Sequence, residues 1–306
     1  MSTTATRVPT PVRPRRAVVR LSWLVAGLAA AVAGAGLLWF GSGPSRPFTT
    51  VRGEPVQLLG HGLYAFDTVF AGGGARGTDA VVLLLGVPLL IASTIYYRRG
   101  SVRAELLHAG MLLFFLYVYG SAALGAVAYN DLFPGYVALF SASLFAFVLA
   151  IASVDRDRLA AAVTTDLPRR GPAVFLMISG LVTLAVWGLP LLVAQANGTV
   201  TDRLDSYTTE LTFALDVGII VPATIVAGVL LLRQIALGYL LAVPLLTLEA
   251  MLAPLITAQT ISQISAGESF PPGQVIGPIA GFLILAALAG WFISGILRQL
   301  REPGAT

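Results

Sequence analysis

The chain has 306 residues, of which 57% are hydrophobic and 11% are charged, whereas soluble domains carry about 25% charged residues. Such a small charged fraction cannot cover a water-facing surface, which excludes an ordinary soluble protein. The apolar residues come in long blocks rather than in alternation, which excludes an outer-membrane β-barrel. Because helices are the other way to satisfy backbone polar groups inside lipid, we predict an all-α, polytopic membrane bundle whose main partner is the lipid bilayer.

Cysteine and lysine are both absent, so all 19 basic residues are arginine. The lack of cysteine excludes disulfides, thiolate metal sites and cysteine nucleophiles. The net charge is only +4, and the sequence has no phosphate-binding glycine loop, zinc-protease signature or Gly-x-Ser-x-Gly elbow. We predict no cofactor, no metal site and no nucleic-acid partner.

A membrane-spanning helix needs roughly 20 mainly apolar residues. Eight segments meet this requirement: 21–40, 79–97, 106–129, 134–153, 172–194, 214–232, 236–257 and 276–297. The first is longer than the apolar part of a signal peptide, and Trp23 and Trp39 bracket it as interfacial anchors. We therefore predict about eight spans, including an uncleaved first one.

The placement of arginine predicts the orientation of these spans. Fifteen arginines fall on the side of the two termini, and four fall on the opposite side, at Arg46, Arg52, Arg76 and Arg203. Because cytoplasmic loops are enriched in basic residues, we predict that both termini are cytoplasmic and that the membrane is a bacterial plasma membrane. The predicted division is a tail at 1–19, a first half at 20–153 with the outer loop 41–78, a linker at 154–171, a second half at 172–298 and a tail at 299–306.

The two halves share a pattern that indicates a 4+4 parallel internal repeat, an arrangement used by some transporters. In each half a long outer loop precedes a span with an acid near its start and a proline further on, Asp79 with Pro88 and Asp216 with Pro222. The alternative is that any eight spans divide into two similar groups of four.

Glu249 is the most informative polar residue, because it is predicted to lie inside the seventh span, in its outer half, between Pro244 and Pro254. An ionised acid at the centre of a membrane helix costs about 2.5–3.5 kcal/mol on insertion scales. The prolines remove backbone hydrogen bonds and are expected to open the helix there. The functional interpretation is a carboxylate that binds a proton or cation in a cavity, and the alternative is a hydrogen-bonded packing residue.

Asp79 and Asp216 are predicted to begin the second and sixth spans. Acids at that position are favoured by capping and by the helix dipole, which is the structural interpretation. If the halves are repeats, both acids are expected at an outer vestibule. Glu105 and His108 share one helix face, but with His61 on the other side of the membrane a metal site is not predicted.

Leu59, Leu63, Phe66 and Phe70 recur at helical spacing in the outer loop, which predicts an amphipathic helix along the membrane interface. The alternative is a lid over a cavity, with His61 or Asp67 pointing inward.

The stretch from Gly60 to Ser143 resembles a group of uncharacterised prokaryotic multi-pass membrane proteins. The resemblance is carried by His61-Gly62-Leu63-Tyr64, Arg76-Gly77-Thr78-Asp79, Pro88, Arg98-Arg99-Gly100-Ser101, Tyr129-Asn130-x-Leu132-Phe133 and Tyr136-Val137-Ala138-Leu139-Phe140-Ser141. It implies topology but no activity, and it places Tyr129 and Asn130 with other polar residues at the outer ends of spans two to four.

The hypothesis we favour is a small-molecule or ion transporter, or a ligand-binding membrane protein, with a site that opens outward. Its ligand or cation candidates are Glu249, Asp79, Asp216, Asp67, His61, Tyr129 and Asn130. One alternative is an outer-face enzyme for lipid-linked substrates that uses Asp67, Asp79, Asp131 or Glu249. Another is a non-catalytic subunit or scaffold of a membrane complex, and a homo-oligomer is left open.

Overall fold

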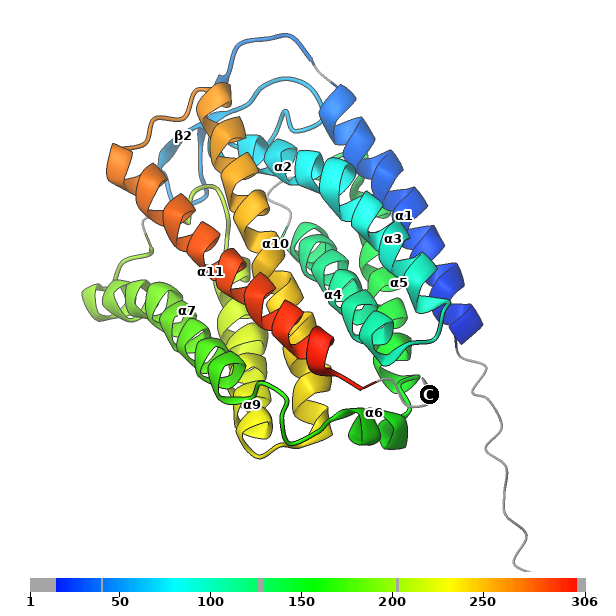
Figure 1. Cartoon of the computed structure of the whole chain (residues 1–306). Helices are drawn as coiled ribbons and strands as arrows, with labels where there is room; N and C mark the ends of the chain where they lie inside the picture. The colour runs from blue at the N-terminus through cyan, green and yellow to red at the C-terminus, as the bar shows by residue number, and fades with distance from the viewer. Residues whose placement is uncertain (1–14, 40, 126–128, 202–203, 302–306) are drawn as a thin grey trace, which may run out of the picture.

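The computed structural model describes residues 15–39, 41–125, 129–201 and 204–301. It contains eight helices that are long and apolar enough to cross a membrane, which confirms an all-α, multi-pass membrane bundle (Figure 1). Most of the predicted tails at 1–19 and 299–306, together with Asp202 and Arg203, lie outside the described residues.

Five of the spans are single helices, namely α1 (Arg15–Leu38), α4 (Val102–Leu124), α5 (Phe133–Ala152), α7 (Arg170–Asn197) and α11 (Pro272–Gln299). The long α10 (Ala236–Ala266) is a sixth. The second span consists of α2 (Val69–Val81), the π-helix η1 (Val82–Gly86) and α3 (Val87–Tyr97). The sixth span consists of α8 (Leu211–Leu215), the π-helix η2 (Asp216–Ile220) and α9 (Val221–Leu232). The short α6 (Arg156–Ala162) lies between α5 and α7.

A short antiparallel hairpin precedes α2, formed by β1 (Arg46–Thr49) and β2 (Pro55–Leu58), with Arg46 opposite Leu58. We call the face with this hairpin the outer face. The opposite face, which holds the start of α1 and the end of α11, is called the inner face (Figure 1).

The second span begins earlier than predicted, at Val69 rather than at Asp79. Thr68 caps this helix, because its hydroxyl accepts the backbone N–H of Ala71. The preceding segment is not the predicted amphipathic helix: it turns through Gly60 and Gly62, whose φ angles of 79° and 70° suit glycine. The prediction of an amphipathic helix along the membrane interface is therefore wrong.

The helix α10 lies at the centre of the bundle and packs against α2, α4, α9 and α11. Glycines allow the closest approaches: a Cβ at Gly77 would lie 2.5 Å from the backbone of Gln259, and one at Gly110 would lie 2.5 Å from the side chain of Thr247. Small residues at such crossings let helix backbones approach closely in lipid. The helix also runs unbroken through Pro244 and Pro254, so the expected opening of the helix around Glu249 is absent.

Polar contacts support the crossing of α2 and α10 near the outer face. The Gln259 amide donates to the Thr78 hydroxyl at 2.8 Å, and the Gln263 amide donates to the Phe70 carbonyl at 3.1 Å. Both glutamines lie on the same face of α10, four residues apart. The outer half of α10 is thus anchored to α2 by hydrogen bonds as well as by close packing.

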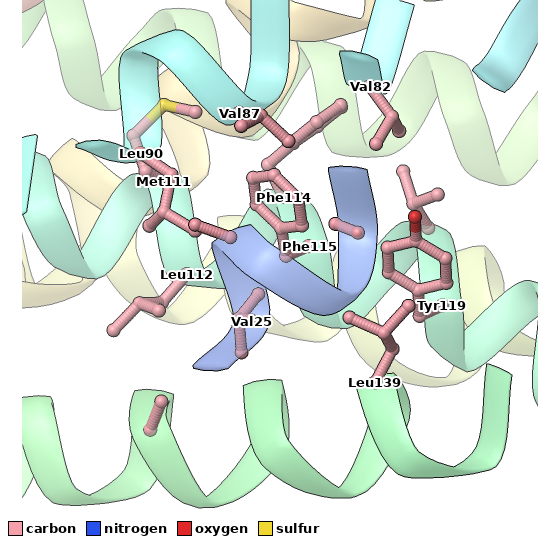
Figure 2. Packing of buried hydrophobic residues seen from close by; sticks show 14 of the residues in the cluster. Val25, Val82, Val87, Leu90, Met111, Leu112, Phe114, Phe115, Tyr119 and Leu139 are labelled. Atoms are coloured by element: carbon pink, nitrogen blue, oxygen red, sulfur yellow. The ribbon is translucent and has the colours of Figure 1, made fainter. Parts of the chain in front are cut away.

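The helices α1, α3, α4 and α5, together with η1 and one face of α10, enclose an apolar core. Figure 2 shows Phe114 and Phe115 at its centre, where their rings meet edge to face with centroids 5.5 Å apart. Leu139 of α5 and Val25 of α1 close the core from two sides. This region is filled by side chains.

The same sequence of local features occurs in both halves at the same residue spacing. A five-residue π-helix precedes Val87-Pro88 in one half and Val221-Pro222 in the other. A proline cannot donate to the carbonyl four residues earlier, and π-helices are rare and occur mostly as single turns inside α-helices. A residue with positive φ then follows, Gly100 or Gln234, and the next span starts at the equivalent position in each half. These features support the predicted repeat.

Cysteine labelling tests the topology directly, since the chain has no cysteine of its own. Val51→Cys places a thiol on the outer hairpin, where Val51 is 84% exposed, and Asp157→Cys places one on exposed α6 at the inner face. We expect a membrane-impermeant maleimide to label only Val51→Cys in intact cells, and both variants after the membrane is opened. Equal labelling of both in intact cells would contradict the fold.

Candidate functional site

Glu249 lies near the midpoint of α10, because that helix continues well past its predicted end. Its side chain is buried, and its Oε1 accepts a hydrogen bond of 2.7 Å from the Ser179 hydroxyl of α7. The other oxygen, Oε2, is buried and has no hydrogen-bond partner among the described residues. An unsatisfied acidic oxygen in an apolar bundle is unfavourable unless water, a proton or a cation reaches it.

A cavity of about 60 Å³ provides that space. Its polar lining comes from Glu249, Asp216, Tyr117, Ser179, Thr183 and Thr224, and apolar side chains of η2, α10 and α11 complete it. A water needs roughly 10–15 Å³ measured in this way, so the cavity holds a few waters or a small cation. It is too small for a drug-sized ligand, which occupies about 300 Å³ or more.

Asp216 forms the outer part of this cavity. Its Oδ1 accepts from the Tyr117 hydroxyl at 3.0 Å, and its Oδ2 accepts from the Trp187 indole N–H at 2.9 Å. The Trp187 ring stacks on Phe213 with centroids 4.4 Å apart, which adds an aromatic layer beside the acid. Asp216 is also the first residue of η2, so the π-helix in the sixth span places a carboxyl at the cavity.

The equivalent place in the first half is closed and apolar. At the residue spacing of the repeat, Phe115 corresponds to Glu249 and Val82 corresponds to Asp216. Figure 2 shows both residues in the core, and Phe115 packs against Gly86 of η1. The two halves therefore share local features at the same spacing, but among the described residues this position carries acids in the second half and apolar side chains in the first.

A third acid, Asp79, lies in a separate cluster nearer the outer face. Its Oδ2 accepts from the Tyr64 hydroxyl at 2.6 Å, and the Tyr136 hydroxyl lies 3.5 Å from that of Tyr64. Burial of the Tyr64 phenol, and to a lesser extent the nearby charge of Asp79, raise the pKa of this phenol well above its usual value. The Tyr64 hydroxyl therefore stays protonated and acts as a donor. Gly36 of α1 makes room for this pair.

The structure corrects the predicted positions of the two aspartates. Neither begins its span: Asp79 is well inside α2 and Asp216 follows α8. The repeat aligns Asp216 with Val82, one helical turn from Asp79, so the acids do not occupy equivalent places. They also do not share the predicted outer vestibule, because the cavity at Glu249 includes Asp216 but not Asp79.

The remaining candidates are spread over the outer face. Asn130 donates weakly to Tyr136, at 3.4 Å, and so adjoins the Asp79 cluster. Tyr129 is 70% exposed and packs on Phe133. None of these residues lines the cavity at Glu249.

His61 and Asp67 belong to the turn before α2. His61 is partly buried beside Gly41 and Gly43. Asp67 is buried. Burial of the Tyr207 phenol, as the larger cause, and the negative charge of Asp67, as the second, raise the pKa of Tyr207 to about 12. Asp67 therefore lies close to the 204–210 segment, and neither residue lines the cavity at Glu249.

The cavity at Glu249 and the Asp79 cluster both include residues that the sequence did not single out as site candidates. Ser179 and Thr183 are four residues apart on α7, a spacing that places two hydroxyls on one helix face. Tyr117 and Trp187 had no distinguishing pattern, since aromatic residues are common in membrane helices. Tyr64 was noted only within the resemblance.

His108 is a buried hydrogen-bonding residue on the inner side of α4. Its Nε2 lies 2.9 Å from the Ser22 hydroxyl, its Nδ1 lies 3.0 Å from the Ser93 hydroxyl, and its ring packs on Tyr97. Glu105, on the same helix, forms an ion pair with Arg15 of α1. These contacts join α1, α3 and α4 at the inner face.

No known protein family, curated protein or solved structure matches the chain. The conclusion that it is an integral, multi-pass membrane protein rests on its eight apolar helices.

Gly36→Ala tests the Asp79 cluster. The added Cβ would lie 2.9 Å from the Tyr64 hydroxyl and overlap the Asp79 carboxyl, so we expect a loss of about 1–3 kcal/mol in the free energy of unfolding. Gly34→Ala, on the same helix, has open space around its Cβ and serves as the control. Thermal unfolding in detergent measures both, and equal melting temperatures would contradict the described packing.

Proposed function

We propose that the chain is a membrane transporter that binds a proton or a small inorganic cation between Glu249 and Asp216. The observation that carries this proposal is the buried Oε2 of Glu249, which has no hydrogen-bond partner among the described residues and belongs to a side chain that lines the cavity. Ionisable residues inside a bundle are typical of ion and proton pathways.

The composition of the cavity supports a cation rather than an anion. The acidic side chains among its described lining residues are two carboxyls, and the other polar groups there are hydroxyls, whose oxygens are ligands for hard cations or for water. None of the arginines that the structure describes lines it. A carboxyl that exchanges a proton with cavity water fits the same arrangement, so proton binding and cation binding are the two forms of the proposal.

The positions of the two acids support a path along the second half. Asp216 lies close to the outer end of its span, whereas Glu249 lies near the midpoint of α10. A cation entering from the outer face would meet Asp216 first and Glu249 second. The enzyme alternative has less support, because the cavity contains Glu249 but none of Asp67, Asp79 and Asp131.

Glu249→Gln tests the proposal, since it removes the charge and keeps the size of the side chain. In proteoliposomes, we expect the wild-type chain to move protons, sodium or potassium down an imposed gradient, measured with trapped fluorescent indicators. The variant should lose the flux by roughly 10-fold or more, because a charged partner is replaced by a neutral one.

Glu54→Gln is the matched control, because Glu54 lies on the outer hairpin and is half-exposed. It should leave the flux unchanged. Wild-type flux in Glu249→Gln, or no movement of any of the three ions by the wild-type chain, would contradict the proposed function.

A further inference from the structure

A basic pocket of about 350 Å³ lies at the inner face, between the start of α1 and the end of α3. The residues that line it are Arg15, Arg16, Val19, Arg20, Tyr97 and Arg98. It lies at the opposite end of the first half from the hairpin and is separate from the Glu249 cavity. Nothing in the proposed transport site uses it.

The shape of the pocket follows from how α1 meets the turn between α3 and α4. Arg15 pairs with Glu105 of α4 and passes over Gly100, where an added Cβ would collide with the guanidinium. Gly100 also has a φ of 76°, which favours glycine. Glycine suits this turn both because it adopts that φ and because it has no Cβ to collide with Arg15. The turn places Arg98, which caps α3, beside the arginines of α1.

The charge in the pocket is not balanced by its lining. Arg15 is paired with Glu105, but the described lining residues include no carboxyl that could pair with Arg16, Arg20 or Arg98. All three of these side chains are exposed at the pocket. Guanidinium groups bind phosphate oxygens through paired N–H donors, which makes a phosphate group the ligand with the best chemical fit.

Apolar residues next to the pocket favour a lipid as the source of that phosphate. Val19 is part of the lining, and Trp23, one turn further along α1, is 43% exposed. Tyr96 of α3 is 56% exposed and carries Arg99 over its ring at 4.7 Å. Acyl chains can lie on these apolar surfaces while the headgroup occupies the arginines, as basic pockets on the cytoplasmic side of membrane proteins allow.

We propose that this inner pocket binds the phosphate headgroup of an anionic phospholipid. The site is formed by Arg16, Arg20 and Arg98, with Arg15 as the residue that holds the helix and the turn together. The inference is independent of the transport proposal and rests on different residues.

The test compares phosphatidylglycerol, phosphatidylcholine and inorganic phosphate, each added to the full-length protein in a neutral detergent. Native mass spectrometry counts bound lipid, and thermal unfolding reports the stabilisation that binding produces. We expect phosphatidylglycerol to bind and to raise the melting temperature, whereas phosphatidylcholine and inorganic phosphate should not at the same concentration.

Replacing Arg16, Arg20 and Arg98 together with glutamine should weaken phosphatidylglycerol binding by roughly 100-fold, since each arginine near an anionic lipid contributes about 1 kcal/mol. The control replaces Arg170, Arg233 and Arg298, which are inner-face arginines outside the pocket, and should retain binding. If the triple variant does not fold, Arg16→Gln alone should give roughly a 5-fold loss.

Equal binding to the pocket variant and the control variant would overturn the proposal, because it would show a general attraction to the basic face. Binding of inorganic phosphate with the same affinity as the lipid would overturn the lipid assignment in favour of a soluble phosphate ligand. Neither result depends on whether the chain transports a cation.

Discussion

The close packing of α10 against its neighbours is the constraint on which the rest of the structure depends. Inside lipid there is little hydrophobic drive between helices, so contact depends on small residues and on polar groups that bond across the interface. Gly77 and Gly110 bring α2 and α4 against α10, and Gln259 and Gln263 fix its outer half. Because α10 is held on several sides, Glu249 is kept away from lipid and faces the small cavity beside α7 and α9.

The sequence predicted the fold class and the number of spans, because long apolar blocks are a strong signal that needs no tertiary information. It failed at the start of the second span, where the run Gly72-Gly73-Gly74 lowers hydropathy and glycine is a poor helix former in general. In the folded chain, the absence of a side chain at Gly73 and Gly74 lets Gln263 of α10 approach, and Gly72 packs against the turn before α2. The turn at 59–68 was misread for a related reason, since its apolar spacing fits a helix while Gly60 and Gly62 redirect the chain.

For the site, sequence reasoning identified the acids but not how they combine. Glu249 and Asp216 were both singled out, and the structure brings them to one cavity. The capping role and the shared vestibule predicted for Asp79 and Asp216 are both contradicted by the structure. The partners Ser179, Tyr117 and Trp187 come from other spans, and which helix faces which is decided by packing. The difference between Glu249 and Phe115 also becomes informative only once the π-helices of the structure set the residue spacing that relates the two halves.

The central claim is that the Glu249 carboxyl exchanges a proton or cation with the cavity. Infrared difference spectroscopy of the protein in lipid, recorded while pH or cation concentration is changed, observes carboxyl groups directly. The account predicts a band of a protonated carboxylic acid that responds to these changes in the wild-type chain and is absent in Glu249→Gln. A spectrum in which the two proteins show the same bands would mean that Glu249 does not change state, and it would contradict the account.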